Sequence, residues 1–218
     1  MRPSLFRRHR PFRRALAFAA SGALAAALGA CGGLLHNDAP ALQAWALAAP
    51  VPAPAAGAAA SAPIPATLRV LRPLAAPALD TDRIALLRAD RSLDYYAANR
   101  WPGRVPELLQ GLVLDTLRAA GSYRAVQPES APFAYQETLQ VEVRDFQAEY
   151  AAGGAPVVRV TLVCTLGQRG DNGVLATFTL SGSAAATDNR MHAIVAAFNQ
   201  ALDAALAALP GQVAAAAR

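Results

Sequence analysis

Two apolar faces at helical spacing lie on either side of a region of alternating strand patterns. Pro102 and Pro106 introduce the first, and Gly121 ends it. The second follows Asp188, a residue type that caps helix N-termini. Both segments are predicted helices with one face on a core. The expected core-facing residues are Val105, Leu108, Leu109, Leu112, Val113, Thr116 and Leu117 in the first helix, and Met191, Ile194, Val195, Phe198, Leu202 and Leu206 in the second.

Three segments between the termini carry strand patterns. Thr67–Leu74 and Arg83–Arg88 are the early candidates, before the first helix. Gln136–Val143 follows that helix and alternates between apolar and polar residues. After Asp145 the apolar phase moves by one residue, to Phe146. Because side chains alternate faces with a period of two, this slip predicts a β-bulge near Asp145.

The last two strand patterns predict a hairpin. Apolar residues alternate from Val158 to Leu166 and again from Val174 to Leu180, around a Gly-containing turn. Cys164 is in phase with this apolar face, so we expect a buried thiol. Groups of strands, each followed by a helix, predict an α+β fold. We expect a single domain with a mainly antiparallel sheet packed against two helices.

The amino terminus has the pattern of an export signal. Six arginines and no acid precede the uncharged stretch Ala15–Leu28, which is shorter than the roughly 20 apolar residues that span a bilayer. Leu28-Gly29-Ala30-Cys31 then resembles the lipobox of bacterial lipoproteins. This pattern predicts a signal peptide over residues 1–30 and lipidation of Cys31. Twin arginines at 7–8 and 13–14 hint at Tat export, but the rest of that motif is missing and Sec export is expected.

The mature chain divides by composition. Residues 31–42 form the expected lipidated tether, and twelve flexible residues reach about 20 Å. Residues 43–209 form the expected domain, with an Ala/Pro-rich loop at 48–66. Residues 210–218 are expected to be a C-terminal tail.

Charge and cysteine content exclude several classes once the signal is removed. The chain has 20 arginines and 15 acidic residues, and six of the arginines lie in the signal. The mature chain therefore has a formal net charge of 14 − 15 = −1. The remaining arginines are interspersed with acids, so we expect no nucleic-acid partner. Cys164 has no disulfide partner once Cys31 is acylated.

Catalytic chemistry is nearly absent from the sequence. A Ser-His-Asp or Cys-His site needs a base beside its nucleophile, and His192 is the only candidate base in the folded region. Cys164 would serve as the nucleophile if the fold brought it to His192. A buried thiol and a surface histidine are the simpler interpretation. We find no nucleophile elbow, phosphate loop or Cys/His metal spacing. We therefore expect no enzyme, no cofactor and no metal.

An aromatic and basic segment precedes the first helix. It contains Tyr95, Tyr96, Arg100 and Trp101. Aromatic residues and arginine are typical anchors of protein interfaces, so Tyr96 and Arg100 are the candidate partner-binding residues. For Tyr95 and Trp101, a place in the core is at least as good an interpretation.

Several features together resemble the ABC-type transport auxiliary lipoproteins, of the PqiC kind. The resemblance covers roughly residues 43–209 and includes the closing hairpin and long last helix. Trp45 departs from the family's usual Tyr-x-Leu, and the Ala/Pro-rich loop is long. The matching features are the lipobox, Trp45-Ala46-Leu47, the strand at Leu68–Leu71, Asp82-Arg83-Ile84, Tyr95-Tyr96, Arg100-Trp101-Pro102, the helix to Ala120, and Val141–Phe146.

The resemblance implies a non-catalytic periplasmic partner of an ABC or mammalian-cell-entry (MCE) lipid transport system, and it leaves a homo-oligomer open. Gly32 stands where Asp commonly signals inner-membrane retention, which favours the outer membrane. Two other classes remain. One is a regulator of envelope assembly or of a cell-wall synthase. The other is a periplasmic hydrolase, which predicts a cleft with converging acids near His192.

Overall fold

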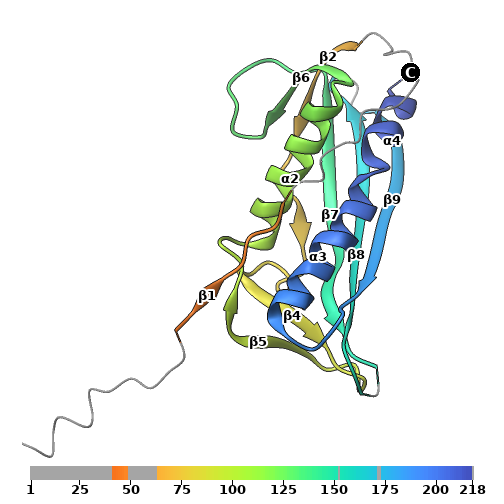
Figure 1. The fold of residues 1–218 in the computed structure, drawn as a ribbon. Helices are drawn as coiled ribbons and strands as arrows, with labels where there is room; N and C mark the ends of the chain where they lie inside the picture. Colours follow the sequence, from red (N-terminus) through yellow and green to blue (C-terminus); the bar gives the residue numbers. More distant parts are fainter. Residues whose placement is uncertain (1–40, 49–62, 152, 171–172, 218) are drawn as a thin grey trace, which may run out of the picture. The chain divides into compact units, whose positions relative to one another are not determined.

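The described residues from Leu42 onward belong to the same folded unit. The predicted signal peptide, Cys31 and the tether up to residue 40 lie outside the described residues, as does most of the Ala/Pro-rich loop. A nine-stranded mixed sheet carries the helices, which confirms a single α+β domain (Figure 1). The computed structural model describes residues 41–48, 63–151, 153–170 and 173–217.

Strand β7 (Glu137–Glu149) is the centre of the sheet. On one side it pairs antiparallel with β8 (Val157–Gln168), which pairs antiparallel with β9 (Val174–Ala185). These two antiparallel pairings are the longest in the sheet, and the β8–β9 pairing confirms the predicted hairpin. The register shifts between Val143 and Asp145, which confirms the predicted bulge.

The other side of β7 pairs with three short strands in succession. These are β2 (Ile64–Val70), β3 (Leu74–Ala75) and β4 (Arg83–Leu87), all parallel to β7. Together they occupy the place of a single strand beside β7, with two interruptions. Because these pairs are parallel, the sheet is mixed.

Three further strands complete the sheet. β6 (Tyr123–Pro128) is parallel to β2, β5 (Leu93–Arg100) is antiparallel to β4, and β1 (Gln43–Ala44) is parallel to β5. The expected strand Thr67–Leu74 differs from the structure. β2 begins at Ile64 and ends at Val70, and a separate β3 follows Pro73.

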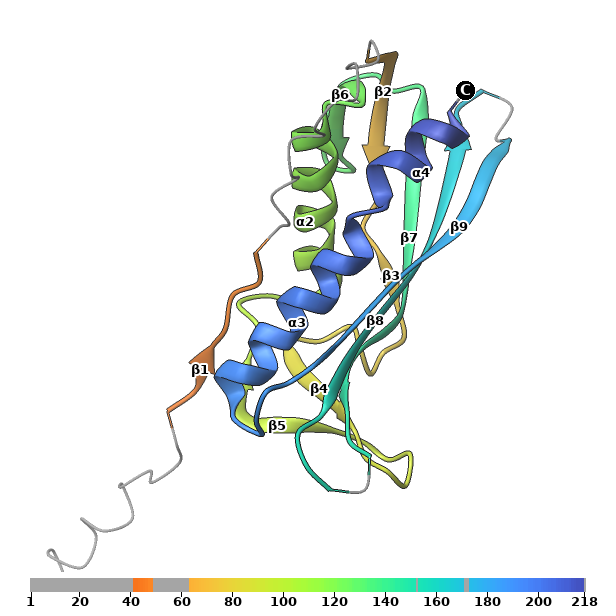
Figure 2. The same cartoon turned by 45° about the vertical axis from the view of Figure 1, so that its right-hand side comes forward.

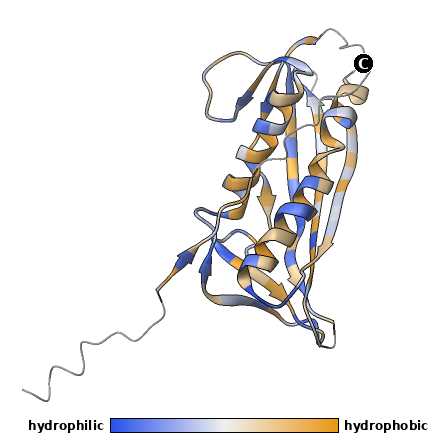
Figure 3. Cartoon of the chain, in the orientation of Figure 1, coloured by the Kyte–Doolittle hydropathy of each residue, from blue (hydrophilic) through white to orange (hydrophobic). Residues whose placement is uncertain are grey.

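Two long helices lie on the same face of the sheet (Figures 1 and 2). α2 (Val105–Ala120) contacts β6 and β2, and α3 (Met191–Leu206) contacts β8 and β9. α2 ends at Gly121, whose φ of 63° is the left-handed conformation that glycine adopts easily. Hydrophobic residues run along both helices and the strands beneath them (Figure 3). The predicted apolar faces therefore form the core.

The end of the chain differs from the expected tail. Residues Leu209–Ala216 form a short helix, α4, in which Leu209 and Val213 are fully buried. Met191–Ala216 is long and apolar enough to cross a membrane by length and composition alone. Its buried side packs on the sheet and on α2, so its hydrophobicity is used in the core.

The start of α3 also differs from the expectation. Arg190 is the N-cap residue, without a side-chain cap. Asp188 lies two residues earlier and accepts a hydrogen bond from the Arg190 N–H at 2.8 Å. Asp188 therefore makes an Asx turn that leads into the helix rather than capping it.

Three aromatic rings fill the core between sheet and helices. Trp101 packs edge-on to Phe198, with ring centroids 5.1 Å apart, and Phe146 lies 5.9 Å from Trp101 and 5.1 Å from Phe198. Tilted and edge-to-face pairs of this kind are favourable aromatic geometries. The trio joins α3 to β7 and to the entry of α2.

Candidate functional site

The first described residues dock against β5 and α3. The Trp45 backbone N–H donates to the Arg100 carbonyl at 2.9 Å, and its indole N–H donates to Asn99 at 2.8 Å. Farther along, the Ala48 N–H donates to the Asn199 side chain at 2.9 Å. Residues 42–48, which we call the arm, are thus held against β5 and α3, at the β5 end of the domain.

Tyr96 is half-buried and tied into the fold. Its hydroxyl hydrogen-bonds with the Tyr150 hydroxyl at 2.9 Å, and the Tyr150 hydroxyl donates to Asn189 at 2.5 Å. Burial, aided by the Tyr150 contact, raises the pKa of Tyr96 above its ordinary value. Its hydroxyl therefore links β5 to the end of β7 and to the loop before α3.

Arg100 is exposed at the end of β5, and its guanidinium lies 3.8 Å from the Asp82 carboxylate. Ala98, between Tyr96 and Arg100, has a φ of 57°, which interrupts the regular alternation of the strand. The two candidate partner-binding residues thus make contacts with different parts of the domain. Their role in partner binding stays a prediction.

The other two aromatic candidates belong to the core. Trp101 is 1% exposed. Tyr95 donates its hydroxyl to the Ala78 carbonyl at 2.9 Å, and the Arg83 guanidinium stacks 3.8 Å above its ring. Trp101 is therefore a core residue, and Tyr95 is partly buried and packs against the core.

Cys164 and His192 occupy different environments. Cys164 is buried in β8, as predicted, and burial raises the pKa of its thiol to about 12. His192 is exposed in the first turn of α3. A buried thiol and an exposed imidazole do not form a nucleophile–base pair.

A hollow of about 550 Å³ lies beside the end of β7, and acids do converge there. Arg159 forms two hydrogen bonds to Glu149, at 3.0 and 3.1 Å. The Gln147 amide donates to both Asp145 and Glu149. His192 is not among the lining residues. These polar groups satisfy one another, and no group of three metal-ligating side chains occurs within the described part of the chain.

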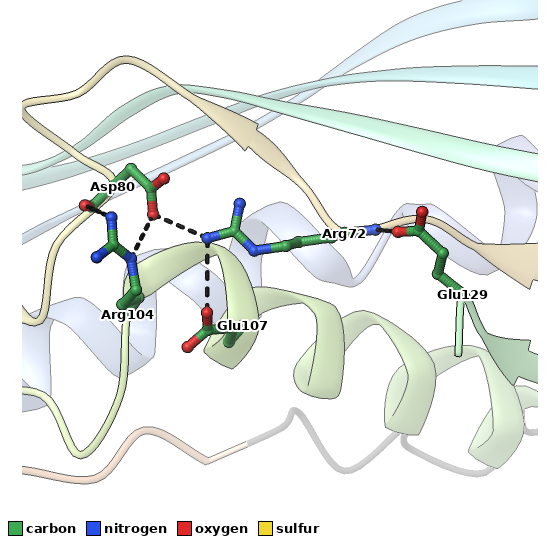
Figure 4. A network of polar contacts seen from close by, with 5 residues as sticks. All are labelled: Arg72, Asp80, Arg104, Glu107 and Glu129. Carbon is green, nitrogen blue, oxygen red and sulfur yellow. Dashed lines mark hydrogen bonds and ion pairs between the residues drawn. The ribbon is translucent and has the colours of Figure 1, made fainter. Parts of the chain in front are cut away.

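A second polar network holds the segment before β4 against the start of α2 (Figure 4). Asp80 accepts hydrogen bonds from Arg104 and Arg72, each at 2.9 Å, and Arg72 also lies 3.5 Å from Glu107. The Arg72 N–H donates to Glu129 at 2.9 Å. Arg104, then Arg72, lowers the pKa of Asp80, although burial opposes this. The network is structural, since each charge has a partner.

The sequence interpretation missed one exposed aromatic residue. Phe133 lies in the loop between β6 and β7 and is 71% exposed. The available signal was an aromatic next to Pro132 in a polar loop, out of phase with the neighbouring strands.

Comparisons with known proteins agree with this architecture. A Xanthomonas campestris protein of the DUF330 family model is 24% identical, with a TM-score of 0.70 over 80% of this chain and 96% of that chain. An uncharacterized protein is 14% identical, with a TM-score of 0.57 over 67% and 91%. Lipoprotein GNA1162 from Neisseria meningitidis is 14% identical over 69% and 99%, but its TM-score of 0.36 is too low to support an argument. At these identities the likeness shows the fold alone.

The sequence itself matches a family model. None of the curated proteins matches the chain. Residues 46–209 match the model described as ABC-type transport auxiliary lipoprotein component. Because this match spans most of the chain, the chain belongs to the ABC-type transport auxiliary lipoprotein family.

Proposed function

We propose that this chain is a lipid-anchored, non-catalytic auxiliary component of an ABC/MCE-type intermembrane lipid transport system. In this proposal Cys31 carries the lipid, and the domain faces the periplasm from the outer membrane. The family supports the transport role. The lipobox and Gly32 support the anchor and the membrane.

The docked arm is the observation that carries the proposal. The twelve-residue tether expected from the sequence would reach about 20 Å as a flexible coil. The arm is hydrogen-bonded to Asn99, Arg100 and Asn199, so it has a fixed place on the domain. An anchor attached in this way holds the β5 end of the domain near the membrane.

The polar chemistry supports docking rather than group transfer. The Cys164 thiol is buried, and the carboxylates in the large hollow are paired with Arg159 or Gln147. The domain then acts through its surface and its attachment to the membrane.

The test compares variants in a strain that lacks this gene. Wild type and Cys164→Ala should incorporate a palmitate analogue, fractionate with membranes and restore the envelope permeability barrier. Cys31→Ser should do none of these, because the acceptor thiol is gone. His192→Ala should restore the barrier fully, because an exposed imidazole outside any catalytic pair contributes little.

Two results would contradict the proposal. Labelling and membrane fractionation of Cys31→Ser would exclude Cys31 as the anchor. Loss of barrier function in His192→Ala, with an unchanged melting temperature, would favour the hydrolase.

A further inference from the structure

The loop between β6 and β7 holds an aromatic side chain out in solvent. Phe133 is 71% exposed, the largest value among the exposed large hydrophobic residues that the structure describes. A phenylalanine ring left in water forfeits about 2 kcal/mol of burial energy. A single exposed apolar residue is common on a protein surface, so Phe133 marks a binding surface only together with its fixed loop and its apolar and basic neighbours.

Side chains from neighbouring strands fix the backbone of this loop. Nη2 of Arg69 donates to the Ala131 carbonyl at 2.8 Å and to the Phe133 carbonyl at 2.9 Å. The Gln127 amide also donates to the Phe133 carbonyl, at 3.0 Å. The ring is thus presented on a pre-organised backbone, which lowers the entropy cost of binding.

Tyr135 connects this loop to a hollow on the adjoining sheet surface. Two guanidinium groups lie over its ring, with the Cζ atom of Arg69 3.8 Å and that of Arg169 4.6 Å from the ring centroid. The hollow measures about 270 Å³, and Tyr135, Arg169 and Val174 are among its lining residues. Val174 is itself 65% exposed. We call Phe133, Tyr135, Arg169 and Val174 the Phe133 surface.

The Phe133 surface is basic as well as apolar. Within the described ranges, neither Arg69 nor Arg169 forms an ion pair with a carboxylate. The nearby Glu129 accepts the Arg72 N–H, as described above. The complementary partner therefore offers an apolar socket with acidic residues around it.

The position of this surface favours a protein over the membrane that holds the anchor. The Phe133 loop precedes β7, whose first residue is Glu137. In β1, Ala44 pairs with Arg100 of β5, and Arg100 pairs with Arg83 of β4. Three residues later in β4, Leu86 pairs with Ala148 of β7. Arg83 is therefore level with a position near Asp145, about eight residues past Glu137, so the arm lies roughly 25 Å along β7 from the Phe133 loop.

We propose that the Phe133 surface is the docking site for a protein subunit of the transport system, with an apolar socket for the Phe133 ring and acidic residues around it. This inference rests on the proposed function. Phe133 enters the socket, and the Arg169 guanidinium pairs with the acidic rim.

The test measures binding of the full lipidated protein, in detergent micelles, to the purified periplasmic domain of the MCE-type subunit from the same organism. Phe133→Ala should raise Kd at least tenfold, because a central aromatic anchor is lost. Arg169→Glu should weaken binding more strongly at low salt than at high salt. The matched control is Leu74→Ala, which removes another exposed side chain (57% exposed) elsewhere on the sheet and should leave Kd unchanged. Thermal melts of all three variants check the fold.

Each contrary outcome has a distinct meaning. Equal Kd values for wild type and Phe133→Ala would overturn this inference and leave the proposed function standing. No binding by wild type would overturn both. A third contrary outcome is that Phe133→Ala keeps subunit binding but loses binding to vesicles of phosphatidylethanolamine and phosphatidylglycerol. The Phe133 surface would then contact lipid, and the inference would be wrong.

Discussion

At Gly182, strand β9 and helix α3 approach so closely that no side chain fits. A Cβ atom at this position would lie 1.9 Å from the Ala201 carbonyl oxygen and 2.9 Å from the Ala205 nitrogen. Both obstacles are helix backbone, which moves only if the helix shifts from the sheet. The small residues Ala201 and Ala205 are themselves fully buried at this contact.

Gly182→Ala should therefore lower the free energy of unfolding by about 3 kcal/mol or more, as overpacking against backbone does. Urea unfolding followed by circular dichroism measures the change. The control is Gly111→Ala, a helical position with nothing within 4 Å of the new Cβ, which should stabilise by up to about 1 kcal/mol. A neutral Gly182→Ala would show that α3 does not pack on β9 in this way.

The buried thiol of Cys164 allows a test of the register of β8. Its thiol is buried and the pKa is raised to about 12, so thiolate is scarce at neutral pH. With Cys31 acylated, maleimide should label the protein only after denaturation. Cys164→Ala should cost about 1 kcal/mol or more through the cavity it leaves. Fast labelling of the native protein would refute the register of β8.

Single residues were predictable where they belong to a periodic pattern. The burial of Cys164 follows from its phase in the strand. Neither the contact of Gly182 with α3 nor the exposure of Phe133 has a local pattern, because both depend on segments far apart in the chain. Tyr95 and Trp101 were ambiguous for the same reason.

Among the elements, the segment between β3 and β4 depends on charge for its position. It has little regular structure, and Asp80 joins it to Arg104 at the start of α2 and to Arg72 after β2. Because these side chains are partly exposed, solvent screens the interaction. The network therefore holds the start of α2 in place but contributes only modestly to the free energy of folding.

Asp80→Asn should cost roughly 1 kcal/mol at pH 7. The pKa of Asp80 is lowered in the folded state, chiefly by Arg104. Its contribution is therefore present above the unfolded pKa, about 3.9, and is lost as pH falls through the lower folded value. Urea midpoints of wild type and Asp80→Asn, measured from pH 7 to pH 2, should converge in acid. A difference that persists at pH 2 would argue against the charge interaction.

Elements with a clear period were predicted, and those without one were missed. The helix that became α2, the β7 bulge and the β8–β9 hairpin follow from their patterns. β6 (Tyr123–Pro128) and β5 (Leu93–Arg100) lack alternation, because each is only partly covered by its neighbours. β6 and β2 also pair in parallel, and such pairing depends on distant residues. The α4 helix was not predicted, although Pro210 lies in its first turn, where proline is tolerated.

On the scale of the whole molecule, the arm and the Phe133 surface lie toward different ends of β7. The anchor would act at one end and a protein partner at the other, which suits a domain that connects a membrane to a transporter. The fold class was predictable from local patterns and the structure confirms it, whereas lipidation of Cys31 stays a prediction. The sequence pattern placed the partner site at Tyr96 and Arg100, which lie on the arm's side of the domain.

We propose that this chain works as part of an ABC-type lipid transport system. The decisive measurement is sensitivity to an anionic detergent in strains lacking this gene, the ATPase of the proposed system, or both. If the two proteins act in one system, the double deletion should be no more sensitive than the more sensitive single deletion. Additive sensitivity in the double deletion would place this chain in a separate process and exclude a role in that transport system.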